Sequence, residues 1–329
     1  MKLKDERVLV TGAGGFIGSH LAERLVREGA RVRALVHYNS RDDWGNLELV
    51  PEEIRREMEV LALDIADPFS VRSAVEGCAC VFHLAALIGI PYSYVAPAAY
   101  LESNIRGTLN VLEAARLCET ARVVHTSTSE TYGTAQYTPI DEAHPLQGQS
   151  PYSASKIGAD KLAESYWCSF GLAVSTLRPF NTYGPRQSAR ALIPAVISQL
   201  KREGRLRLGN LTPVRDFTFV ADTVAAFLAV AESEETIGKT LNAGSGKGIT
   251  VREIAERLIQ LVKPGTPLET EDERVRPARS EVMALIADAS QLRELTGWRP
   301  EVSLTEGLQQ TIDFIDTNPE AFRHDHYVI

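Results

Sequence analysis

Near its start the chain reads Val8-Leu9-Val10-Thr11-Gly12-Ala13-Gly14-Gly15-Phe16-Ile17-Gly18. The apolar run before the glycines predicts a short buried strand, and apolar side chains at helical spacing predict a helix over residues 16–28. Glycines between such a strand and helix are typical of the turn that binds the pyrophosphate of a dinucleotide, with help from the helix N-terminus. We expect cofactor contacts from Gly12, Gly15, Phe16, Ile17 and Gly18. The alternative is a glycine-rich turn that binds no ligand.

Strand-like and helix-like segments alternate through the first half of the chain. Further strands are predicted at residues 32–36, 59–63, 80–84 and 121–126, and helices at residues 68–76 and 97–118. Strands separated by helices of this length predict an α/β fold with a doubly wound parallel sheet, the Rossmann arrangement, joined by right-handed crossovers.

The pattern loosens after residue 177, where glycines, prolines and arginines gather. Helices are predicted there near residues 190–202, 251–261 and 304–314. A chain of 329 residues is also longer than a single core usually supports. We expect residues 1–180 to form the dinucleotide-binding domain, with residues 217–245 returning to it. The remaining segments are expected to form a smaller, partly interleaved C-terminal substrate lobe, made of residues 181–216 and 246–329.

The composition argues against several classes of protein. With 44% hydrophobic and 24% charged residues the chain is typical of a folded globular protein, and its formal net charge of −8 argues against nucleic-acid and membrane partners. The cysteines lack zinc-site spacing, so we expect reduced core thiols and no metal; they are Cys78, Cys80, Cys118 and Cys168. The charged N-terminus does not resemble a signal peptide, and the longest apolar run is too short to span a bilayer. A cytoplasmic location is therefore predicted.

The end of the second predicted strand bears on the choice of cofactor. An acidic residue there would bind the ribose hydroxyls of NAD, but the chain reads Leu35-Val-His-Tyr-Asn-Ser-Arg41. Ser40 and Arg41 are suited to the 2′-phosphate of NADP, which favours NADP, with NAD as the alternative and Arg41 then a solvated loop residue. After the third strand, Asp64 and Ile65 are placed to meet the adenine, or Asp64 only caps the next helix.

Tyr152 and Lys156 stand four residues apart in a helix predicted over residues 152–167, so both side chains lie on one helix face. A nearby ammonium stabilises a phenolate, so we expect a lowered pKa that lets Tyr152 take a hydroxyl proton. The strand predicted at residues 121–126 is followed by Thr128-Ser129-Glu130, which would lie at the same sheet edge. Tyrosine and lysine at this spacing also occur on protein surfaces, and the glutamate has an alternative role as a structural carboxylate.

Further motifs, taken with these residues, resemble the extended short-chain dehydrogenases/reductases that act as NAD(P)-dependent sugar epimerases and dehydratases. The motifs are the glycine turn, His83-Leu-Ala-Ala86, Asn104-Ile-Arg-Gly-Thr-Leu-Asn110, Tyr152 with Lys156, Arg178-Pro-Phe-Asn-Thr-Tyr-Gly-Pro-Arg186, Arg215-Asp-Phe217 and Gly297-Trp298. The resemblance covers nearly the whole chain. It implies a tightly bound NAD or NADP that is recycled in each turnover and a nucleotide-diphosphate sugar as substrate. It also implies cofactor contacts from Leu84, Ala85 and Ala86.

The resemblance also suggests residues for substrate binding and assembly. Residues at or near the family positions around the nucleotide are Asn181, Arg186, Arg190, Arg215 and Arg276. A guanidinium suits phosphate oxygens, although each arginine alone is equally a surface charge. His83, His125 and Trp298 are expected to pack rather than to catalyse. The helices over residues 97–118 and 152–167 resemble those that pair across a two-fold axis in this family, so a homodimer is expected.

The triplet Thr128-Ser129-Glu130 discriminates between reactions within the family. In 4,6-dehydratases of the dTDP-glucose type the triplet is Thr-Asp-Glu, where the Asp protonates the departing hydroxyl and the Glu removes the C5 proton. Ser129 departs from that pattern. Similar Thr-Ser-Glu triplets occur in GDP-mannose 4,6-dehydratases and UDP-glucuronate decarboxylases, whereas several 4-epimerases lack the Glu. Glu130 therefore favours elimination chemistry.

The leading hypothesis is a lyase, a 4,6-dehydratase that converts GDP- or UDP-linked N-acetylglucosamine to a 4-keto-6-deoxy sugar. Residues 126–133, 145–152 and 186–190 resemble the dehydratases of the legionaminic-acid pathway. The alternatives are a UDP-glucuronate decarboxylase, a nucleotide-sugar 4-epimerase and, in a different class, a non-catalytic dinucleotide-binding sensor. The last has no need of a catalytic tyrosine and lysine.

In the expected mechanism Tyr152, helped by Thr128 and Lys156, removes the 4-hydroxyl proton while C4 loses hydride. Glu130 then removes the C5 proton. It returns that proton, through Ser129 or a water, to the hydroxyl leaving from C6, and hydride goes back to C6.

Overall fold

The computed structural model describes residues 1–271 and 282–322, so the predicted site residue Arg276 lies outside the described residues. Its central sheet contains seven strands in the order β10-β6-β5-β4-β1-β2-β3, and every neighbouring pair is parallel. The strands are β1 (Arg7–Thr11), β2 (Arg31–Val36), β3 (Glu59–Ala62), β4 (Cys80–His83), β5 (Arg122–Thr126), β6 (Val174–Pro179) and β10 (Thr240–Ala243). The predicted α/β fold with a parallel sheet is therefore confirmed.

Helices cover both faces of this sheet. One layer contains α1 (Phe16–Arg27) and α9 (Val220–Glu232), and the other contains α3 (Pro68–Val75), α6 (Gly107–Leu117) and α7 (Pro151–Phe170). Side chains alternate between the faces of a strand, and accordingly Val8 and Val10 of β1 belong to the first core and Leu9 to the second. Strands buried on both faces explain why the sequence reads as short continuous apolar runs.

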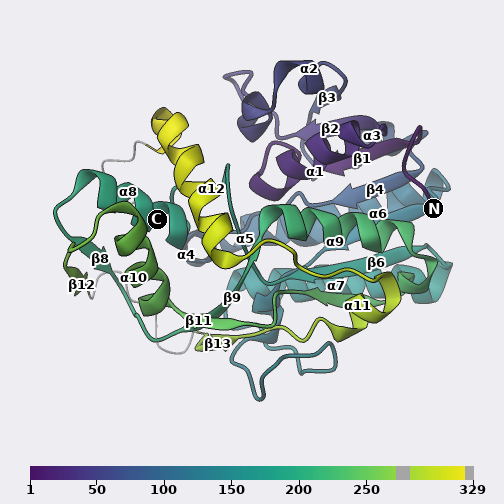
Figure 1. Cartoon of the computed structure of the whole chain (residues 1–329). Coiled ribbons are helices and arrows are strands. Elements are labelled where there is room, and N and C mark those ends of the chain that lie inside the picture. Colours follow the sequence, from purple (N-terminus) through teal and green to yellow (C-terminus); the bar gives the residue numbers. More distant parts are fainter. Residues whose placement is uncertain (272–281, 323–329) are drawn as a thin grey trace.

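A smaller group of strands forms two further sheets beside the main one (Figure 1). Strand β9 pairs with β7, β11 and β13, and a separate two-stranded sheet joins β8 to β12. These strands are β7 (Asn181–Tyr183), β8 (Leu206–Leu208), β9 (Val214–Phe219), β11 (Gly248–Thr250), β12 (Leu268–Thr270) and β13 (Ala284–Leu285). Helices α8 (Leu192–Arg202), α10 (Val251–Val262) and α12 (Leu304–Thr317) pack with these strands, whereas α11 (Ser290–Thr296) packs against β10 and α9. Figure 1 shows α8, α10, β8 and β12 gathered at one end of the molecule, away from the N-terminal strands.

The segment over residues 217–245, which the sequence assigned to the main domain, is divided in the structure. Phe217 belongs to β9 in the small sheet, where it pairs in register with Asn181. The return to the main sheet therefore begins with α9 at Val220 and ends with β10 beside β6. The division of the chain into two domains stays a prediction.

The helix predicted over residues 97–118 is interrupted. It consists of α5 (Pro97–Tyr100), a π-helical turn η2 (Leu101–Arg106) and α6. Such π turns often occur at functional sites, and this one contains the buried Asn104. The remaining short elements are α2 (Glu52–Arg55), α4 (Ile90–Val95), and the 3-10 turns η1 (Gly45–Leu49), η3 (Ser129–Tyr132), η4 (Glu234–Thr236) and η6 (Pro319–Phe322).

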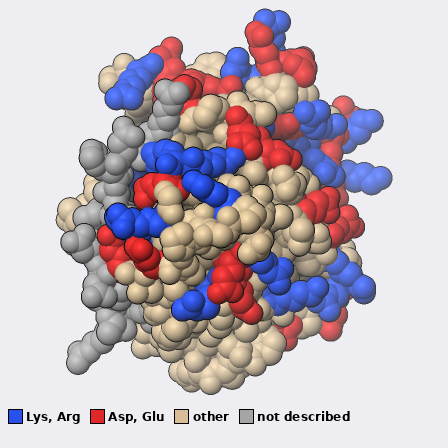
Figure 2. Space-filling model, turned by 60° about the vertical axis from the view of Figure 1, so that its left-hand side comes forward, with Lys and Arg blue, Asp and Glu red and all other residues tan. Residues whose placement is uncertain are grey.

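The surface carries charges of both signs. Figure 2 shows Lys and Arg side chains interspersed with Asp and Glu on the face that it presents. All four cysteines are free; Cys78 and Cys80 are buried as expected, but Cys168 is exposed because it lies on the outer side of α7. In the described part of the chain, no helix is long and apolar enough to cross a membrane. The cytoplasmic location stays a prediction.

Candidate active site

The glycine turn between β1 and α1 lies against the loop that follows β4. Thr11 Oγ1 accepts hydrogen bonds from the backbone N–H groups of Leu84 and Ala85, both at 3.1 Å. Gly12 has a φ of +71°, and a Cβ at this position would lie 2.8 Å from the Ala85 nitrogen. A Cβ on Gly18 would overlap the Gly12 carbonyl oxygen. Residues predicted from two separate motifs thus meet at the carboxyl ends of the strands, where doubly wound folds bind dinucleotides.

We expect Gly12→Ala to destabilise the fold much more than Gly171→Ala. Both glycines have a positive φ, +71° and +68°, but a Cβ on Gly171 would meet nothing within 4 Å. Gly171→Ala should therefore cost only the backbone strain, about 1 kcal/mol. Gly12→Ala adds a steric overlap with Ala85, so the total should reach about 3 kcal/mol. Urea unfolding of both variants checks this, and equal losses would contradict the close approach of the two loops.

The loop after β2 carries the residues that the sequence links to cofactor choice. Ser40 and Arg41 are both exposed. Asn39 shapes the loop, because its Oδ1 accepts the Arg41 backbone N–H at 3.0 Å. Further along, the Asn46 backbone N–H donates to the Gly14 carbonyl at 2.9 Å. The loop therefore returns to the glycine turn, with Ser40 and Arg41 left accessible for a ligand.

Asp64 and Ile65 follow β3. Asp64 is exposed and its Oδ1 accepts the Ala66 N–H at 2.9 Å, whereas Asp67 supplies the cap of α3. The alternative that Asp64 caps this helix is therefore wrong, because its carboxylate closes a local turn instead. Ile65 is buried, and a Cβ on Gly107 would overlap its side chain. An adenine contact from Asp64 and Ile65 stays a prediction.

Helix α7 presents a row of polar side chains to the end of β5. Tyr152, Lys156 and Asp160 lie one helical turn apart and are all buried. Lys156 Nζ donates to the Thr126 carbonyl oxygen at 2.6 Å. The Tyr152 hydroxyl is hydrogen-bonded to the side chain of Thr128. Three of the five predicted catalytic residues therefore meet at the carboxyl end of β5. They are Thr128, Tyr152 and Lys156.

The start of α7 is held on two sides. Ser150 and Ser153 form a capping box, in which each side chain accepts the other's backbone N–H, so the helix begins sharply. Asn104 Nδ2 donates to Ser155 Oγ at 2.9 Å, and its side chain also bonds both the N–H and the carbonyl of Leu87. The π turn thereby ties the loop after β4 to the helix that carries the tyrosine and lysine.

The pKa values at this site differ from the expectation. Burial lowers the pKa of Lys156 to about 8, although the charge of Asp160 opposes this shift. Burial raises the pKa of Tyr152, the Thr128 hydrogen bond lowers it, and the negative charge of Glu130 raises it further. The lowered tyrosine pKa predicted from the sequence is therefore wrong for the protein alone, because the Lys156 ammonium points to a backbone carbonyl and the phenol is desolvated.

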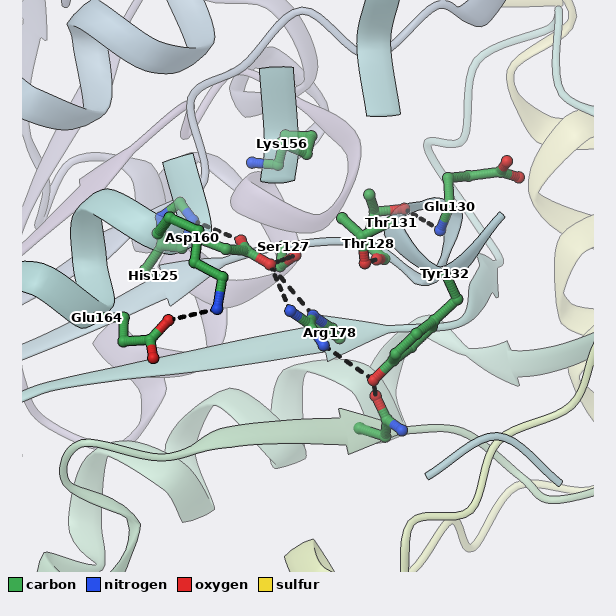
Figure 3. A network of polar contacts seen from close by, with 12 residues as sticks. His125, Ser127, Thr128, Glu130, Thr131, Tyr132, Lys156, Asp160, Glu164 and Arg178 are labelled. Carbon is green, nitrogen blue, oxygen red and sulfur yellow. Dashed lines mark hydrogen bonds and ion pairs between the residues drawn. The ribbon is translucent and has the colours of Figure 1, made fainter. Parts of the chain in front are cut away.

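Glu130 lies in the 3-10 turn η3 beside this row. The Thr128 hydroxyl accepts the Glu130 backbone N–H at 3.2 Å and so caps the turn. Ser129 is buried and Glu130 is partly exposed. Figure 3 shows the Glu130 side chain extending away from Arg178, on the opposite side of the turn from Tyr132. Because Thr128 both caps this turn and bonds the Tyr152 hydroxyl, Glu130 lies near the tyrosine, and its negative charge contributes to the raised pKa of Tyr152.

A buried network behind Lys156 was not singled out from the sequence (Figure 3). Asp160 Oδ2 accepts Ser127 Oγ at 2.7 Å and Arg178 Nη2 at 2.8 Å, while Oδ1 accepts His125 Nε2 at 3.2 Å. Burial would raise the pKa of Asp160, but the donated hydrogen bonds and the Arg178 charge lower it to about 2. In the sequence, Asp160 follows Lys156 by four residues, and this spacing indicates that the two side chains share one helix face.

The other expected packing residues are enclosed. His83 Nδ1 shares a 2.9 Å hydrogen bond with Thr11 Oγ1, and burial holds the pKa of both His83 and His125 below the usual value. Both imidazoles are therefore neutral near pH 7. Trp298 Nε1 donates to the Asp222 carbonyl at 2.9 Å, which ties the C-terminal segment to α9.

Two of the predicted substrate residues lie in the small sheet. Asn181 is in β7, and its Oδ1 is buried with no hydrogen-bond partner among the described residues. Arg215 is in the neighbouring β9, where its Nη1 donates to the Val214 carbonyl at 3.0 Å. Arg190 is exposed ahead of α8. Their contacts with a nucleotide sugar stay predictions.

Arg186 lies elsewhere, against α1. Its Nη2 donates to Glu23 Oε2 at 2.6 Å, and its carbonyl accepts Asn46 Nδ2 at 3.0 Å. His20 Nε2 bonds the neighbouring Pro185 carbonyl at 2.9 Å. Arg186 therefore joins the segment after β7 to α1 and η1, and its contact with a diphosphate stays a prediction.

This fold and site define a class of enzyme. A doubly wound sheet, a glycine turn at its first strand and a buried Tyr–Lys pair beside β5 are the features of extended short-chain dehydrogenases/reductases. The family described as GDP-mannose 4,6 dehydratase matches residues 9–311. The chain belongs to this family.

Similar proteins catalyse more than one reaction. A UDP-glucose 4-epimerase from Mycolicibacterium smegmatis is 34% identical, over 94% of this chain and 98% of the epimerase. A UDP-N-acetyl-alpha-D-glucosaminuronate decarboxylase from Bacillus cytotoxicus is 31% identical, over 94% and 97%. The structure of the dTDP-glucose 4,6-dehydratase DesIV from Streptomyces venezuelae, determined with NAD bound, superposes with a TM-score of 0.87 at 28% identity, over 95% and 98%. The chain is thus an enzyme of a superfamily of NAD-dependent nucleotide-sugar dehydratases, epimerases and decarboxylases.

Proposed function

We propose that this chain is a nucleotide-sugar 4,6-dehydratase that converts GDP- or UDP-linked N-acetylglucosamine to its 4-keto-6-deoxy product. The observation that supports this best is that Glu130 lies in the turn capped by Thr128, the residue whose side chain bonds the Tyr152 hydroxyl. Dehydration needs a base for the C5 proton in addition to the group that deprotonates the 4-hydroxyl, and this pair supplies both. The choice of N-acetylglucosamine and the link to legionaminic acid are supported by sequence resemblance alone.

The glycine turn fits a dinucleotide cofactor, because it joins β1 to the N-terminus of α1 at the carboxyl end of the sheet, with Gly12 and Gly18 packed too closely on backbone for a Cβ. The chemistry that a bound nicotinamide would supply is acceptance of hydride from C4 and its return to C6. The absence of an acid at the end of β2 and the exposed Ser40 and Arg41 support NADP, with NAD as the alternative.

Tyr152 removes the proton of the 4-hydroxyl. The Thr128 hydrogen bond lowers its pKa and stabilises the phenolate, and the Lys156 ammonium, fixed on the Thr126 carbonyl, adds positive charge nearby. Burial keeps water from the phenolate, so solvent screens its electrostatic interactions with these groups only weakly.

Glu130 then removes the C5 proton, which the new C4 ketone acidifies. It is partly exposed, so it can reach a bound sugar, and its backbone is fixed by the Thr128 cap. The same carboxyl returns its proton to the departing C6 hydroxyl through the buried Ser129 or a water, because a serine is itself a poor acid. Water leaves and hydride returns to C6 of the resulting alkene. C5 takes a proton from solvent, which balances the 4-hydroxyl proton that Tyr152 releases to solvent before the next turnover.

Product masses test the assignment. The protein is incubated with GDP- and UDP-N-acetylglucosamine, each with NAD and with NADP, and the products are weighed by mass spectrometry. Loss of one water from either sugar is expected, faster with NADP. Unchanged masses with both sugars would remove the dehydratase proposal in favour of an epimerase.

The second candidate is a UDP-glucuronate decarboxylase, which the relative from Bacillus cytotoxicus supports. That reaction calls for a cation near the C6 carboxylate. Arg186 is the buried arginine of the segment after β7. Its guanidinium pairs with Glu23, so it is not a free cation for the C6 carboxylate, which weakens this candidate. Incubation with UDP-glucuronate and detection of carbon dioxide separates this candidate from the dehydratase. Because the relatives are enzymes, a non-catalytic sensor has no support.

A homodimer is the proposed assembly. The outer sides of η2, α6 and α7 carry exposed apolar side chains, which are Leu101, Leu109, Leu117, Trp167 and Phe170. These helices are the ones that the sequence resemblance places at a two-fold axis. Light scattering should give twice the mass of one chain.

A further inference from the structure

The contacts between α7 and the end of β5 continue past the tyrosine and lysine. Along residues 126–128 the Thr126 carbonyl accepts Lys156, and the Thr128 side chain bonds Tyr152. The two residues that flank Thr126 donate instead to Asp160, one turn further along α7. The carboxylate therefore holds the strand on both sides of the carbonyl that receives the lysine.

We propose that Asp160 is a positioning residue that holds the Lys156 ammonium on the Thr126 carbonyl and keeps it charged. This inference rests on the proposed function, in which Lys156 assists Tyr152. Asp160 touches neither substrate nor cofactor; it acts on the lysine through the strand and through its own charge. His125 Nε2 and Ser127 Oγ are the two donors, at 3.2 and 2.7 Å.

Charge explains why a carboxylate is needed here. Lys156 is buried, and burial alone favours the neutral amine. Among the described residues, Asp160 is the one group whose charge raises the pKa of Lys156 and so favours the ammonium. His83 of β4 and His125 of β5 also face the lysine, but both are neutral because burial lowers their pKa values.

Arg178 of β6 keeps Asp160 ionised. Its Nε and Nη2 donate to Asp160 Oδ2 at 3.1 and 2.8 Å, and its Nη1 donates to the Tyr132 hydroxyl at 3.0 Å. Figure 3 shows Arg178 between Asp160 and Tyr132, with Lys156 on the other side of the carboxylate. Arg178 shares Oδ2 with the Ser127 hydroxyl, while Oδ1 accepts His125 Nε2, so the paired carboxylate still bonds both residues that flank Thr126.

The test is the pH profile of Asp160→Asn. Removing the carboxylate charge makes the Lys156 ammonium less stable, so the lysine pKa falls below the wild-type value of about 8. The alkaline limb of kcat/KM for C4 oxidation should therefore move to lower pH by about one unit, which is about tenfold in rate above the limb. The KM for the nucleotide sugar should be unchanged. Carbon-13 NMR of labelled lysine, assigned with Lys156→Arg, reads the same shift directly.

Tyr132→Phe is the matched control, since it removes a hydrogen bond from the other end of Arg178 and leaves Asp160 untouched. Its alkaline limb should stay in place. If Asp160→Asn fails to fold with Arg178 unpaired, the double variant with Arg178→Gln removes both charges of the pair and should move the limb in the same direction.

The outcomes separate the two proposals. An unchanged alkaline limb and an unchanged Lys156 signal in the folded variant would overturn the role of Asp160. If Tyr152→Phe and Lys156→Ala leave C4 oxidation intact, the proposed function itself fails. If those two variants lose activity while Asp160→Asn keeps the wild-type profile, only the further inference fails.

Discussion

Replacing Tyr152 by phenylalanine is expected to lower kcat for nucleotide-sugar turnover by about 10²–10⁴-fold, the usual contribution of a positioned general base. The ring packs with Ile90 and Tyr100, and its centroid lies 6.2 Å from that of Tyr100, so phenylalanine keeps the apolar contacts. Only the hydroxyl, and with it the Thr128 hydrogen bond, is lost. Rapid mixing with substrate should therefore give no reduced nicotinamide absorbance, although the variant binds cofactor and unfolds at the wild-type temperature.

Helix α7 supplies a matched control in Tyr166. Tyr166 lies six residues beyond Asp160, and its hydroxyl donates to Glu113 Oε2 of α6 at 2.9 Å. Tyr166→Phe makes the same chemical change in the same helix, and its kcat should stay near the wild-type value. Retention of more than about a tenth of the rate by Tyr152→Phe would remove the tyrosine from the proton transfer.

The doubly wound sheet could be predicted because its evidence is local. Short apolar runs, helical spacing and a glycine turn all lie within a few residues of one another, and β1, α1 and β2 follow them closely. The spacing of Tyr152 and Lys156 is local in the same sense. The triplet after β5 could be placed beside them because the carboxyl ends of parallel strands share one edge.

Contacts between distant segments could not be predicted. Arg186 and Glu23 are separated by 163 positions, and nothing near either residue indicates their ion pair. The sequence also does not indicate the π turn at Asn104, because a π turn and an α turn have the same apolar pattern over so few residues. Both features depend on how the loops after β4 and β7 pack against their neighbours.

The raised pKa of Tyr152 could not be predicted, for a physical reason. The sequence shows a lysine four residues away but not the burial of the phenol or the carbonyl that receives the ammonium. Asp160 was within reach of the same reasoning, one further turn along the helix. Its three donors come from β5, the residue after β5, and β6, so only the assembled sheet reveals its role.

Glu130→Gln is expected to separate oxidation from elimination. Glutamine keeps the shape of the side chain and the Thr128 cap of η3, but it cannot accept the C5 proton. Removing the negative charge also lowers the pKa of Tyr152, so C4 oxidation should proceed at least as fast as in the wild type. Dehydration should fall by about 10²–10⁴-fold.

The expected product of Glu130→Gln is a 4-ketone that retains its 6-hydroxyl, with the cofactor accumulating in its reduced form. In heavy water the wild type should exchange the C5 hydrogen and lose water, whereas the variant should do neither. Glu113→Gln, on the partner of Tyr166, makes the same substitution outside the site and should leave the product mass unaltered from wild type. Full loss of water by Glu130→Gln would show that another group removes the C5 proton, and Glu130 would then have only a structural role. Exchange at C5 without loss of water would instead place Glu130 at the second step, as the acid that protonates the departing hydroxyl.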